Sequence, residues 1–549
     1  MKKIVIIAAL VCGAWQQADA QYVSKVWVSD QKDGTYINPI IHADYSDPDV
    51  CAVGDDFYMT ASSFGCTPGL PILHSKDLVN WRLANYALKE IEPTIFFNAP
   101  QHGKGVWAPS IRYHNGEFFI YWGDPDWGIF MVKTKDPLGE WEKPVLVKAG
   151  KGMIDPTPLW DEDGKVYLVH AWAGSRAAFN SVITVCEMNA GGTKVISEPV
   201  LVFDGNDGVN HTIEGPKFYK RNGYYYILAP AGGVVTGWQL ALRSRNVYGP
   251  YESKIVMAQG DTDINGPHQG GWVETCTGES WFINFQDKAM YGRVLHLNPV
   301  KWENDWPVIG EDKDGDGCGE PVKRYKKPDV GRIYPIETPI ESDEFNTRQL
   351  GLQWEWHANY QDTFGFTSDL GYIRIYGHIL SKDFVNFWEV PNLLLQKFPA
   401  EEFTATAKLK VSAKADGQQS GLIVMGWDYG YLGVVKEGDK FILNQVVCKD
   451  AEQRSPETVT HLAELPVSRR FGAGLYPNYE RDIYLQVKVT GGGICYFSYS
   501  LDGRKYTLAG VPFTARQGKW IGAKVGLFST APYGKERGWV DADWFRIDK

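Results

Sequence analysis

The sequence predicts an all-β protein in which a five-bladed β-propeller is followed by an antiparallel β-sandwich. Its 549 residues are enough for two domains. Helical periodicity is nearly absent, and aromatic residues, which favour strands, make up 14% of the chain. A local hairpin pattern also recurs through the first part of the chain, which is typical of a repeat architecture.

Each copy of this repeat contains a proline, a short strand, a turn with glycine, and an aromatic-rich returning strand. Glycine beside Asp, Asn or Glu in the turn is typical of β-hairpins. The five copies are DPDVCAVGDDFYMTA from Asp47, APSIRYHNGEFFIYW from Ala108, DPTPLWDEDGKVYLVHA from Asp155, EGPKFYKRNGYYYILA from Glu214 and GPHQGGWVETCTGESWFINF from Gly266. They lie roughly 50 residues apart, which is the length of a four-stranded blade. We therefore predict a five-bladed propeller over residues 35–325, and the alternative is an irregular β-sandwich with accidental similarity between its hairpins.

The second part of the chain has a different pattern. Residues 326–341 are predicted to be a linker, because prolines and glycine interrupt them and no periodicity runs through them. Beyond the linker, segments such as EFTATAKLKV, IYLQVKVT and VDADWFRID alternate as half-buried strands do. Residues 342–549 are therefore predicted to form the antiparallel β-sandwich.

Residues 1–20 have the pattern of a secretory signal peptide, with two lysines, a short apolar run and small residues that end at Ala20. The run is too short to span a bilayer, and no later segment is apolar enough to do so. We therefore expect an exported protein, periplasmic or extracellular, without a membrane span. A lipid anchor on Cys12 is the less favoured alternative, because Ala-Leu-Val before it is a poor match to the usual small residue.

The net charge of −10 and the lack of a long basic run argue against nucleic acid as a partner. One of the eight cysteines, Cys12, lies in the predicted signal peptide, which leaves seven. No Cys-x-x-Cys pair occurs, so neither a disulfide scaffold nor a zinc site is predicted. Cys51 and Cys66 are expected to be either a disulfide or, as we favour, two buried free thiols.

The inner strand of every propeller blade lines a shared axis, so side chains at the starts of these strands converge. The residues at the repeat prolines are Asp47, Ala108, Asp155, Glu214 and His268. Three carboxylates and an imidazole are therefore expected in one central funnel, where like charges shift each other's pKa values apart. Such a funnel can hold one carboxyl protonated beside another that is ionised. Aspartate before proline is also a common turn residue, but registration in three repeats favours catalysis.

Two carboxylates across an aromatic-lined pocket are what glycoside hydrolysis requires, because one protonates the leaving oxygen and the other activates water or attacks the sugar. Six segments are distinctive when taken together: NPIIHADYSDPDV, TASSFGCTPGLPILHSKDLVNW, VWAPSIRYHNGEFFIYW, GMIDPTPLWDEDGKVYLVHA, TIEGPKFYKRNGYYYILAPAGG and GRVLHLNPVKW. With these segments the chain resembles glycoside hydrolase family 43 over residues 37–325. The members of this family are five-bladed propeller enzymes that act on arabinose and xylose linkages.

The resemblance implies hydrolysis with inversion of configuration. It implies Asp47 as the general base that activates water, Glu214 as the general acid, and Asp155 as the carboxylate that orients the acid and modulates its pKa. Asp49 stands where the family more commonly has serine. We expect Asp49 to face away from the pocket along its strand.

The same resemblance implies further contacts with the substrate. Phe64 and Trp107 match aromatic positions that line the pocket, and Arg293 matches an arginine that contacts the sugar. His268 matches a histidine on the propeller axis that binds a metal ion or ordered water near the substrate; a buried core histidine is the alternative.

Residues 342–549 resemble a concanavalin A-like sandwich, which follows the propeller in one branch of the family and lends a loop to the rim of the active site. Asp343, Glu344 and Asp541 lie near its two ends, and they are expected to be surface caps or to share a structural calcium. Residues 312–320, DKDGDGCGE, imitate a calcium loop, but no helices flank them and Lys323 replaces the final glutamate. An acidic surface turn is therefore favoured there, and no cofactor is expected for the chemistry itself.

The sequence thus predicts an inverting exo-glycosidase that removes terminal non-reducing α-L-arabinofuranosyl or β-D-xylosyl residues from plant hemicellulose. Its partners are then arabinose- or xylose-containing oligosaccharides. The exo preference follows from the second domain, which in the family helps to close the groove into a pocket. The alternatives are an endo-arabinanase and a non-catalytic carbohydrate-binding propeller. The sequence does not separate the two sugars, and it carries no signal for an oligomeric state.

Overall fold

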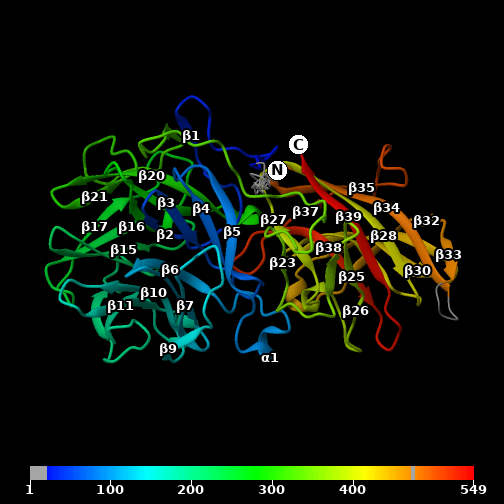
Figure 1. Cartoon of the computed structure of the whole chain (residues 1–549), viewed down its shortest axis with the longest axis horizontal. Coiled ribbons are helices and arrows are strands. Elements are labelled where there is room, and N and C mark those ends of the chain that lie inside the picture. Colours follow the sequence, from blue (N-terminus) through cyan, green and yellow to red (C-terminus); the bar gives the residue numbers. More distant parts are fainter. Residues whose placement is uncertain (1–20, 472–476) are drawn as a thin grey trace, which may run out of the picture.

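The computed structural model describes residues 21–471 and 477–549, so the predicted signal peptide and Cys12 lie outside the described residues. Two domains built of strands lie side by side in Figure 1, the first coloured blue to green and the second yellow to red. The described helices are short turns. They are α1 (Thr94–Phe97), α2 (Gly174–Ala177), η1 (Ala289–Tyr291), η2 (Phe387–Glu389), η3 (Ala451–Gln453) and η4 (Gly491–Gly493). The predicted all-β class is confirmed.

The first domain is the predicted five-bladed propeller, because each blade is a four-stranded antiparallel sheet whose strands follow in chain order. Blade one is β2 (Asp49–Val53), β3 (Asp56–Thr60), β4 (Gly69–Ser75) and β5 (Trp81–Leu88). Blade two is β6 (Trp107–His114), β7 (Glu117–Asp124), β8 (Gly128–Thr134) and β9 (Val145–Ala149). Blade three is β10 (Met153–Trp160), β11 (Val166–Trp172), β12 (Val182–Met188) and β13 (Val200–Asp204). Blade four is β14 (Lys217–Arg221), β15 (Tyr224–Ala231), β16 (Trp238–Ser244) and β17 (Glu252–Met257). Blade five is β18 (His268–Glu274), β19 (Ser280–Asp287), β20 (Arg293–Glu303) and β21 (Trp306–Ile309).

The inner hairpins use the turn chemistry that the repeats predict. Asn115 and Gly116 join β6 to β7 with φ of 49° and 85°, and Asn222 and Gly223 join β14 to β15 with φ of 50° and 73°. Glycine adopts this left-handed region freely and asparagine tolerates it, so Asn-Gly is suited to a two-residue hairpin turn.

The propeller closes through the segment that precedes blade one. The N–H of Ile40 donates to the carbonyl of Leu295 at 2.7 Å, and the N–H of Tyr45 donates to the carbonyl of Arg293 at 3.1 Å. β1 (Thr35–Ile37) also pairs with β22 (Arg324–Lys326). Since residues 40–45 run beside β20, the start of blade one lies against the strand that begins with Arg293.

The second domain is the predicted sandwich, in which a sheet of eight strands packs on a sheet of nine. The first sheet holds β23 (Glu355–Trp356), β26 (His378–Ile379), β27 (Leu394–Lys397), β29 (Gln419–Met425), β30 (Tyr429–Glu437), β31 (Lys440–Cys448), β32 (Thr458–Leu465) and β38 (Lys524–Ala531). The second holds β24 (Gly365–Ser368), β25 (Tyr372–Tyr376), β28 (Phe403–Ala413), β33 (Ser468–Phe471), β34 (Pro477–Thr490), β35 (Ile494–Ser500), β36 (Thr507–Leu508), β37 (Phe513–Thr514) and β39 (Trp539–Asp548). Alternate residues of β28, namely Ala405, Ala407, Leu409 and Val411, belong to the apolar core between the sheets.

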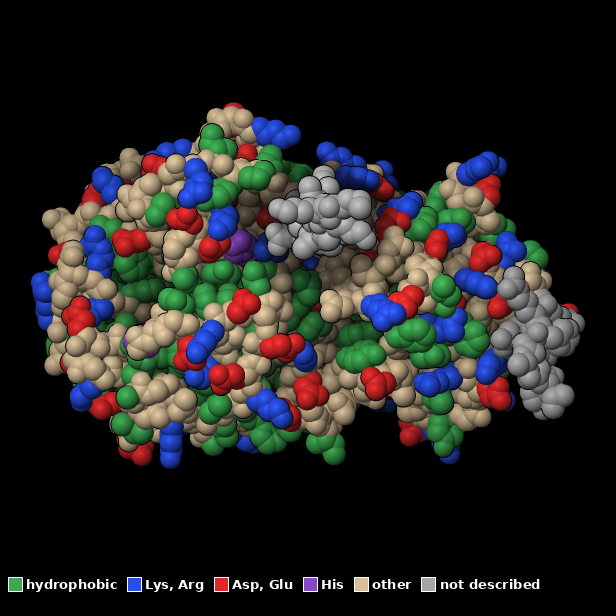
Figure 2. All heavy atoms as spheres, viewed as in Figure 1, with side chains coloured by type: hydrophobic (Ala, Val, Ile, Leu, Met, Phe, Trp, Pro, Cys, Tyr) green, Lys and Arg blue, Asp and Glu red, His purple; other side chains and the backbone are tan. Residues whose placement is uncertain are grey.

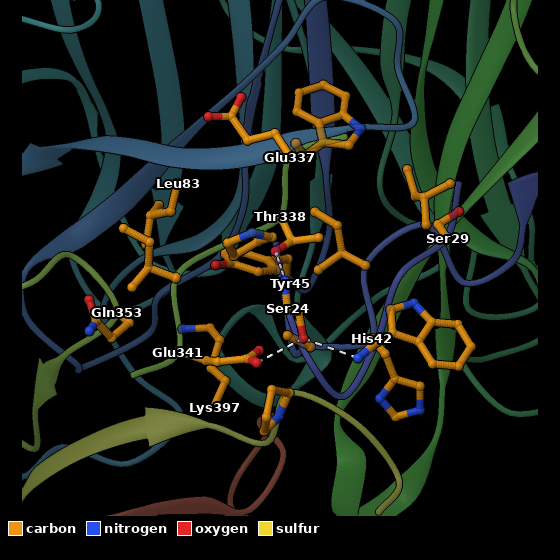
Figure 3. Close-up of a pocket in the computed structure, with 18 of the residues that line it drawn as sticks. Ser24, Ser29, His42, Tyr45, Leu83, Glu337, Thr338, Glu341, Gln353 and Lys397 are labelled. Carbon is orange, nitrogen blue, oxygen red and sulfur yellow. Dashed lines mark hydrogen bonds between the residues drawn. The ribbon is translucent and has the colours of Figure 1, made fainter. Parts of the chain in front are cut away.

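The connection between the domains is packed against the start of the described chain. Lys327 Nζ pairs with Asp30 Oδ2 at 2.5 Å, and with Asp77 Oδ2 of blade one at 2.9 Å. Ser24 donates its backbone N–H to Thr338 Oγ1 at 2.7 Å and its hydroxyl to Glu341 Oε1 at 2.8 Å. Figure 3 shows Ser24, Thr338 and Glu341 in a hollow that also takes residues from both domains. The predicted linker is therefore a structured strap.

The described chain also bears on two predictions, those about cysteine pairing and membrane-crossing helices. Its seven cysteines are free thiols, so Cys51 and Cys66 are not paired. No helix within residues 21–471 and 477–549 combines the length and apolar character that a membrane crossing needs. On the face in Figure 2, acidic and basic side chains are interspersed over both domains.

Glu341 should make the stability of the protein depend on pH. Burial raises its pKa from 4.5 to about 7, although Ser24 and Lys25 partly offset this. Between these values the folded chain holds a proton that the unfolded chain loses, so the free energy of unfolding falls as the pH rises through this window. The Glu341→Gln variant should escape this loss, which amounts to on the order of 2–3 kcal/mol at the upper end of the window. Calorimetric unfolding at a series of pH values measures both proteins, and parallel stability curves for variant and wild type contradict this prediction.

Candidate active site

The chain bends through the left-handed backbone region where the inner strand of each blade begins. The five bends have φ of 55° at Asp47, 34° at Ala108, 57° at Asp155, 61° at Gly215 and 38° at Gln269. A positive φ is costly for residues other than glycine, and such strain is often found at functional sites. Four of these residues, Asp47, Ala108, Asp155 and Gln269, line one pocket on the axis.

In the last two blades the predicted residues Glu214 and His268 stand one position before the bends, which fall on Gly215 and Gln269. Glu214 therefore reaches the pocket from the position before the bend, with 36% of its side chain exposed. His268 is fully buried and does not line the pocket.

Asp47, the predicted general base, is fixed by three hydrogen-bond donors. Ser46 and Ser62 donate their hydroxyls to Asp47 Oδ2 at 2.7 and 2.6 Å, and Arg293 Nη1 donates to Oδ1 at 3.1 Å. Arg293 Nη1 also donates to Ser46 Oγ at 2.7 Å. Arg293 thus lines the pocket, as predicted, and it also contacts the predicted base. Sequence reasoning missed Ser46 and Ser62, because serine near an aspartate carries no distinctive signal.

Asp155 and Glu214 form the other side of the site. Burial, and next the negative charge of Glu214, raise the pKa of Asp155 well above its ordinary value. Asp155 Oδ2 accepts the backbone N–H of Gly215 at 2.7 Å, directly after Glu214 in the chain. Asp155 therefore holds the backbone that carries the predicted acid, which agrees with an orienting role.

His268 lies behind Glu214. Its Nε2 is 3.2 Å from Glu214 Oε1, and its Nδ1 has no hydrogen-bond partner among the described residues. The imidazole therefore supports the predicted acid and reaches the substrate only through it. A metal ion at His268 stays a prediction.

Asp49 faces away from the pocket, as expected. It is fully buried, and its Oδ2 accepts from Arg112 Nη1 at 2.5 Å and from the backbone N–H of Ile111 at 2.8 Å. Lys217, which sequence reasoning missed, is also fully buried, and its Nζ donates to the carbonyl of Pro109 at 3.0 Å. Lys217 is the first residue of β14, and no local sequence pattern marks it.

Aromatic side chains form the remaining wall. Phe64 and Trp107 line the pocket as predicted, with their rings 6.5 Å apart in an edge-on arrangement. Trp520 of the sandwich domain also lines the pocket, and its ring lies 6.4 Å from that of Trp107 and 5.6 Å from the Arg293 guanidinium. A loop from the second domain thus reaches the rim, as the sequence implies. Trp520 itself was missed, because nothing local in GKWIGAK marks it.

The predicted calcium ligands of the second domain do not come together. Asp541 makes two hydrogen bonds with Arg374 at 2.7 and 2.8 Å, and Glu344 makes two with Arg546 at the same distances. Asp343 accepts from the indole of Trp354 at 2.9 Å. Two of the three acids thus have arginine partners, which favours the surface-cap alternative, and a calcium ion there stays a prediction.

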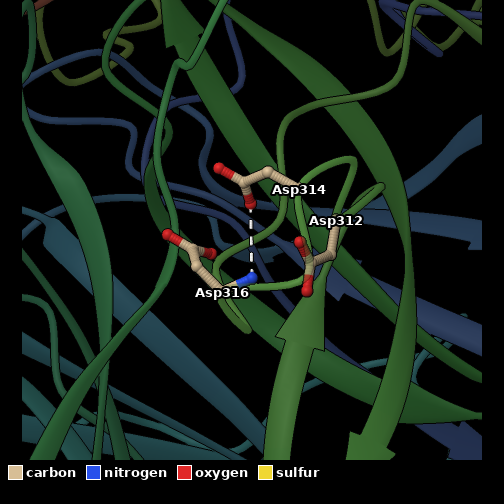
Figure 4. A group of neighbouring side chains, drawn as sticks. All are labelled: Asp312, Asp314 and Asp316. Carbon is tan, nitrogen blue, oxygen red and sulfur yellow. Dashed lines mark hydrogen bonds between the residues drawn. The ribbon is translucent and has the colours of Figure 1, made fainter.

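The loop at residues 312–320 forms the favoured acidic turn, which Figure 4 shows. Carboxylate oxygens of Asp312, Asp314 and Asp316 lie within 4.8 Å of one another. Asp312 accepts the N–H groups of Gly315 and Gly317 at 2.7 and 2.9 Å, so hydrogen bonds within the turn account for its conformation. The turn is far along the chain from the axial carboxylates and shares no lining residue with their pocket.

The axial pocket has a cavity volume of about 80 Å³ and brings Asp47, Asp155 and Glu214 together beside aromatic rings. A fixed carboxylate on one side and a supported glutamate on the other can activate water and protonate a leaving oxygen. This fold and this site define a glycoside hydrolase.

Comparison with known proteins agrees. Residues 36–307 match the family profile described as Glycosyl hydrolases family 43, and residues 342–548 match that of the Beta xylosidase C-terminal Concanavalin A-like domain. The chain belongs to glycosyl hydrolase family 43, as its sequence motifs predict.

Three similar proteins cover most of the chain. A putative beta-xylosidase of Xylanibacter ruminicola is 37% identical over 514 residues, which are 92% of this chain and 88% of the relative. The non-reducing end alpha-L-arabinofuranosidase BoGH43B of Bacteroides ovatus is 31% identical, over 76% of this chain and 79% of its own length. The crystal structure of the GH43 BlXynB protein from Bacillus licheniformis has a TM-score of 0.78 and 26% identity, and covers 94% of this chain and 99% of its own.

Replacing the sandwich-derived wall should weaken substrate binding. We expect Trp520→Ala to raise KM for a chromogenic aryl glycoside roughly tenfold, about 1.4 kcal/mol, because one face of the pocket is lost. The matched control is Tyr533→Ala, which removes an exposed aromatic side chain of the same domain that does not line the pocket. Steady-state kinetics of the three proteins measure the effect, and an unchanged KM in Trp520→Ala contradicts it.

Proposed function

We propose that this chain is an inverting exo-glycosidase that removes terminal non-reducing β-D-xylosyl or α-L-arabinofuranosyl residues from plant hemicellulose oligosaccharides. The observation that carries the proposal is the small axial pocket, in which Asp47 and Glu214 face a cavity that Trp520 of the second domain walls off. The names of the relatives from X. ruminicola and B. ovatus support both sugars.

In this mechanism, Asp47 takes a proton from a water molecule whose oxygen attacks the anomeric carbon. The bond from that carbon to the leaving oxygen breaks, and Glu214 gives its proton to the leaving oxygen. The water attacks from the face opposite the leaving group, so the configuration inverts. Arg293, Ser46 and Ser62 keep the carboxylate of Asp47 in one orientation throughout.

Asp155 serves the acid rather than the sugar. Its carboxylate fixes the N–H of Gly215. Burial raises the pKa of Asp155 well above its ordinary value, and the negative charge of Glu214 adds to this effect. Since two neighbouring carboxyls resist being ionised together, the pair favours retention of one proton. His268 supports Glu214 from the other side at 3.2 Å.

Exo action agrees with the shape of the site. An endo-arabinanase needs a groove that lets a polymer pass on both sides of the cleaved bond. Here Phe64, Trp107 and Trp520 surround a cavity of about 80 Å³, which suits one terminal sugar. A non-catalytic binding propeller would not need a carboxylate fixed by three donors opposite a supported glutamate.

The proposal extends to the setting of the enzyme. The signal-peptide pattern of residues 1–20 supports export to the periplasm or the outside of the cell. The proton donor and acceptor are both side chains, so the chemistry itself is proposed to need no cofactor. A structural cation at His268 remains compatible with its buried, unpartnered Nδ1.

The test of function is hydrolysis of nitrophenyl β-D-xyloside and α-L-arabinofuranoside, with the anomer of the first product followed by proton NMR. The wild type should release one sugar of inverted configuration, and Asp47→Asn and Glu214→Gln should each lose about 10²–10⁴-fold in kcat. Glu162→Gln, an exposed glutamate of blade three, serves as the matched control. Retained configuration, or equal turnover by Glu214→Gln and wild type on an arabinose- or xylose-containing oligosaccharide, whose leaving oxygen needs protonation, excludes the mechanism.

Asp155→Asn should change the pH profile as well as the rate. The amide oxygen can still accept the Gly215 N–H, but the variant lacks the second negative charge. Loss of the last proton from the site then becomes easier, so the alkaline limb of the kcat profile should move to lower pH. Rates measured from about pH 4 to about pH 9 test this, and a uniform drop without any shift of the limb assigns Asp155 to backbone support alone.

A further inference from the structure

One buried carboxylate, that of Asp44, joins both domains at the back of the active site. Its Oδ1 accepts the backbone N–H of Arg293 at 2.8 Å, and its Oδ2 accepts the backbone N–H of Gly522 at 3.0 Å. Arg293 belongs to propeller blade five, and Gly522 belongs to the sandwich loop that carries Trp520. A single side chain is therefore hydrogen-bonded to two segments, one from each domain, that both supply residues to the pocket.

The backbone segments of the two domains approach so closely at this junction that a Cβ atom does not fit at Gly292 or at Gly522. A Cβ on Gly292 would lie 2.5 Å from Asp44 Cγ, and a Cβ on Gly522 would lie 2.7 Å from the nitrogen of Gly292. The N–H of Ala523 also donates to the carbonyl of Met290 at 2.8 Å. The loop at residues 518–523 is thus docked directly on the segment that leads into Arg293.

Charge at the junction is balanced by neighbouring side chains. Glu355 pairs with Lys397 and Lys524, and although burial opposes it, these ammonium groups lower the pKa of Glu355 to about 2. Burial raises the pKa of Asp44, and the N–H of Arg293 and the charge of Lys397 only partly oppose this. Lys524 begins the strand that follows the Trp520 loop.

The residues after Asp44 continue to hold Arg293. The N–H of Tyr45 donates to the carbonyl of Arg293 at 3.1 Å, and the hydroxyl of Ser46 accepts from Arg293 Nη1 at 2.7 Å. Asp47 then accepts from the same nitrogen at 3.1 Å. A shift of the Arg293 backbone would therefore move its guanidinium, which is hydrogen-bonded directly to Asp47, the predicted base.

We propose that Asp44 is a positioning residue that fixes Trp520 relative to Arg293 and Asp47, so that docking of the sandwich domain sets the geometry of the catalytic pocket. The proposal rests on the proposed function, in which Asp47 is the base and Trp520 a wall of the sugar site. It assigns the second domain a part in base alignment, in addition to its part in closing the pocket.

The test is a double-mutant cycle on kcat and KM, with Asp44→Asn, Trp520→Ala and the combined variant. The Asn amide keeps the shape of the carboxylate but offers one acceptor oxygen, so one of the two N–H groups loses its partner. We expect Asp44→Asn to lower kcat/KM at least tenfold, with changes in both kcat and KM. In the Trp520→Ala background the same substitution should cost at least threefold less, because part of its effect runs through Trp520.

The matched control is Tyr86→Phe. It removes a hydrogen bond across the same domain interface, from the Tyr86 hydroxyl to the carbonyl of Leu352 at 3.1 Å, without touching Asp44 or Trp520. Its effect should add to that of Trp520→Ala. If Asp44→Asn is within twofold of wild type, or if its effect is fully additive with Trp520→Ala, the proposal is overturned.

A second variant and a hydrogen-exchange measurement test the same contact independently of Asp44→Asn kinetics. Gly522→Ala displaces the same loop while Asp44 stays intact, so it should reproduce the loss if Asp44→Asn does not fold. Hydrogen–deuterium exchange of residues 518–523 should rise in Asp44→Asn and stay unchanged in Tyr86→Phe, and unchanged exchange in both overturns the proposal. The ratio of kcat/KM between each variant and wild type is measured on whichever aryl glycoside the wild type cleaves. A wrong sugar assignment therefore contradicts the proposed function but does not affect this test.

Discussion

Convergence of five inner strands on one axis is the constraint from which the rest of the site follows. Each strand enters through a left-handed bend, and three of the side chains brought together there are carboxylates. Buried like charges need nearby counter-charges or protons. The propeller itself supplies two cations near the axis. Arg293 donates a hydrogen bond to Asp47. Lys217 is fully buried and interacts electrostatically with Asp49 and Asp155. Burial lowers the pKa of Lys217, and these carboxylates oppose that effect.

The same constraint separates two aspartates that look alike in the sequence. Asp47 and Asp155 both precede proline at the start of an inner strand, and both have φ close to 55°. Asp47 receives a guanidinium and two hydroxyl donors, whereas Asp155 receives a backbone N–H and lies against Glu214. Different surroundings on one scaffold can thus give chemically similar groups different roles, which is a common route to an acid and a base in one site.

Local patterns explain which features could be predicted from the sequence. A β-hairpin is specified by neighbouring residues, so the five repeats and turns such as Asn222-Gly223 are visible in the chain and are confirmed. Glu214 was found through its place at the start of the fourth repeat, two residues before Pro216, although the bend of that blade falls on Gly215.

Contacts between distant residues set the limit of that prediction. Trp520 contacts Trp107 although more than 400 residues separate them in the sequence, and no local motif predicts this contact. The acids at Glu344 and Asp541 gave a plausible calcium set by position alone, whereas their arginine partners Arg546 and Arg374 are set by strand pairing. Sequence reasoning therefore located the reacting groups better than the groups that hold them.

The interface between the domains shows why the sandwich is more than an attached module. If the propeller stood alone, the carboxylate of Asp44 would lose the N–H of Gly522. The ion pairs of Glu355 with Lys397 and Lys524, which belong to the sandwich domain, would be absent as well. Arg293 would keep Asp47 but lose the aromatic ring of Trp520 that covers its guanidinium at 5.6 Å. Water would then reach the guanidinium and its carboxylate partner, and solvent screening weakens such a pair. The rigidity of the base is therefore a property of the two domains together, although every reacting carboxylate belongs to the propeller.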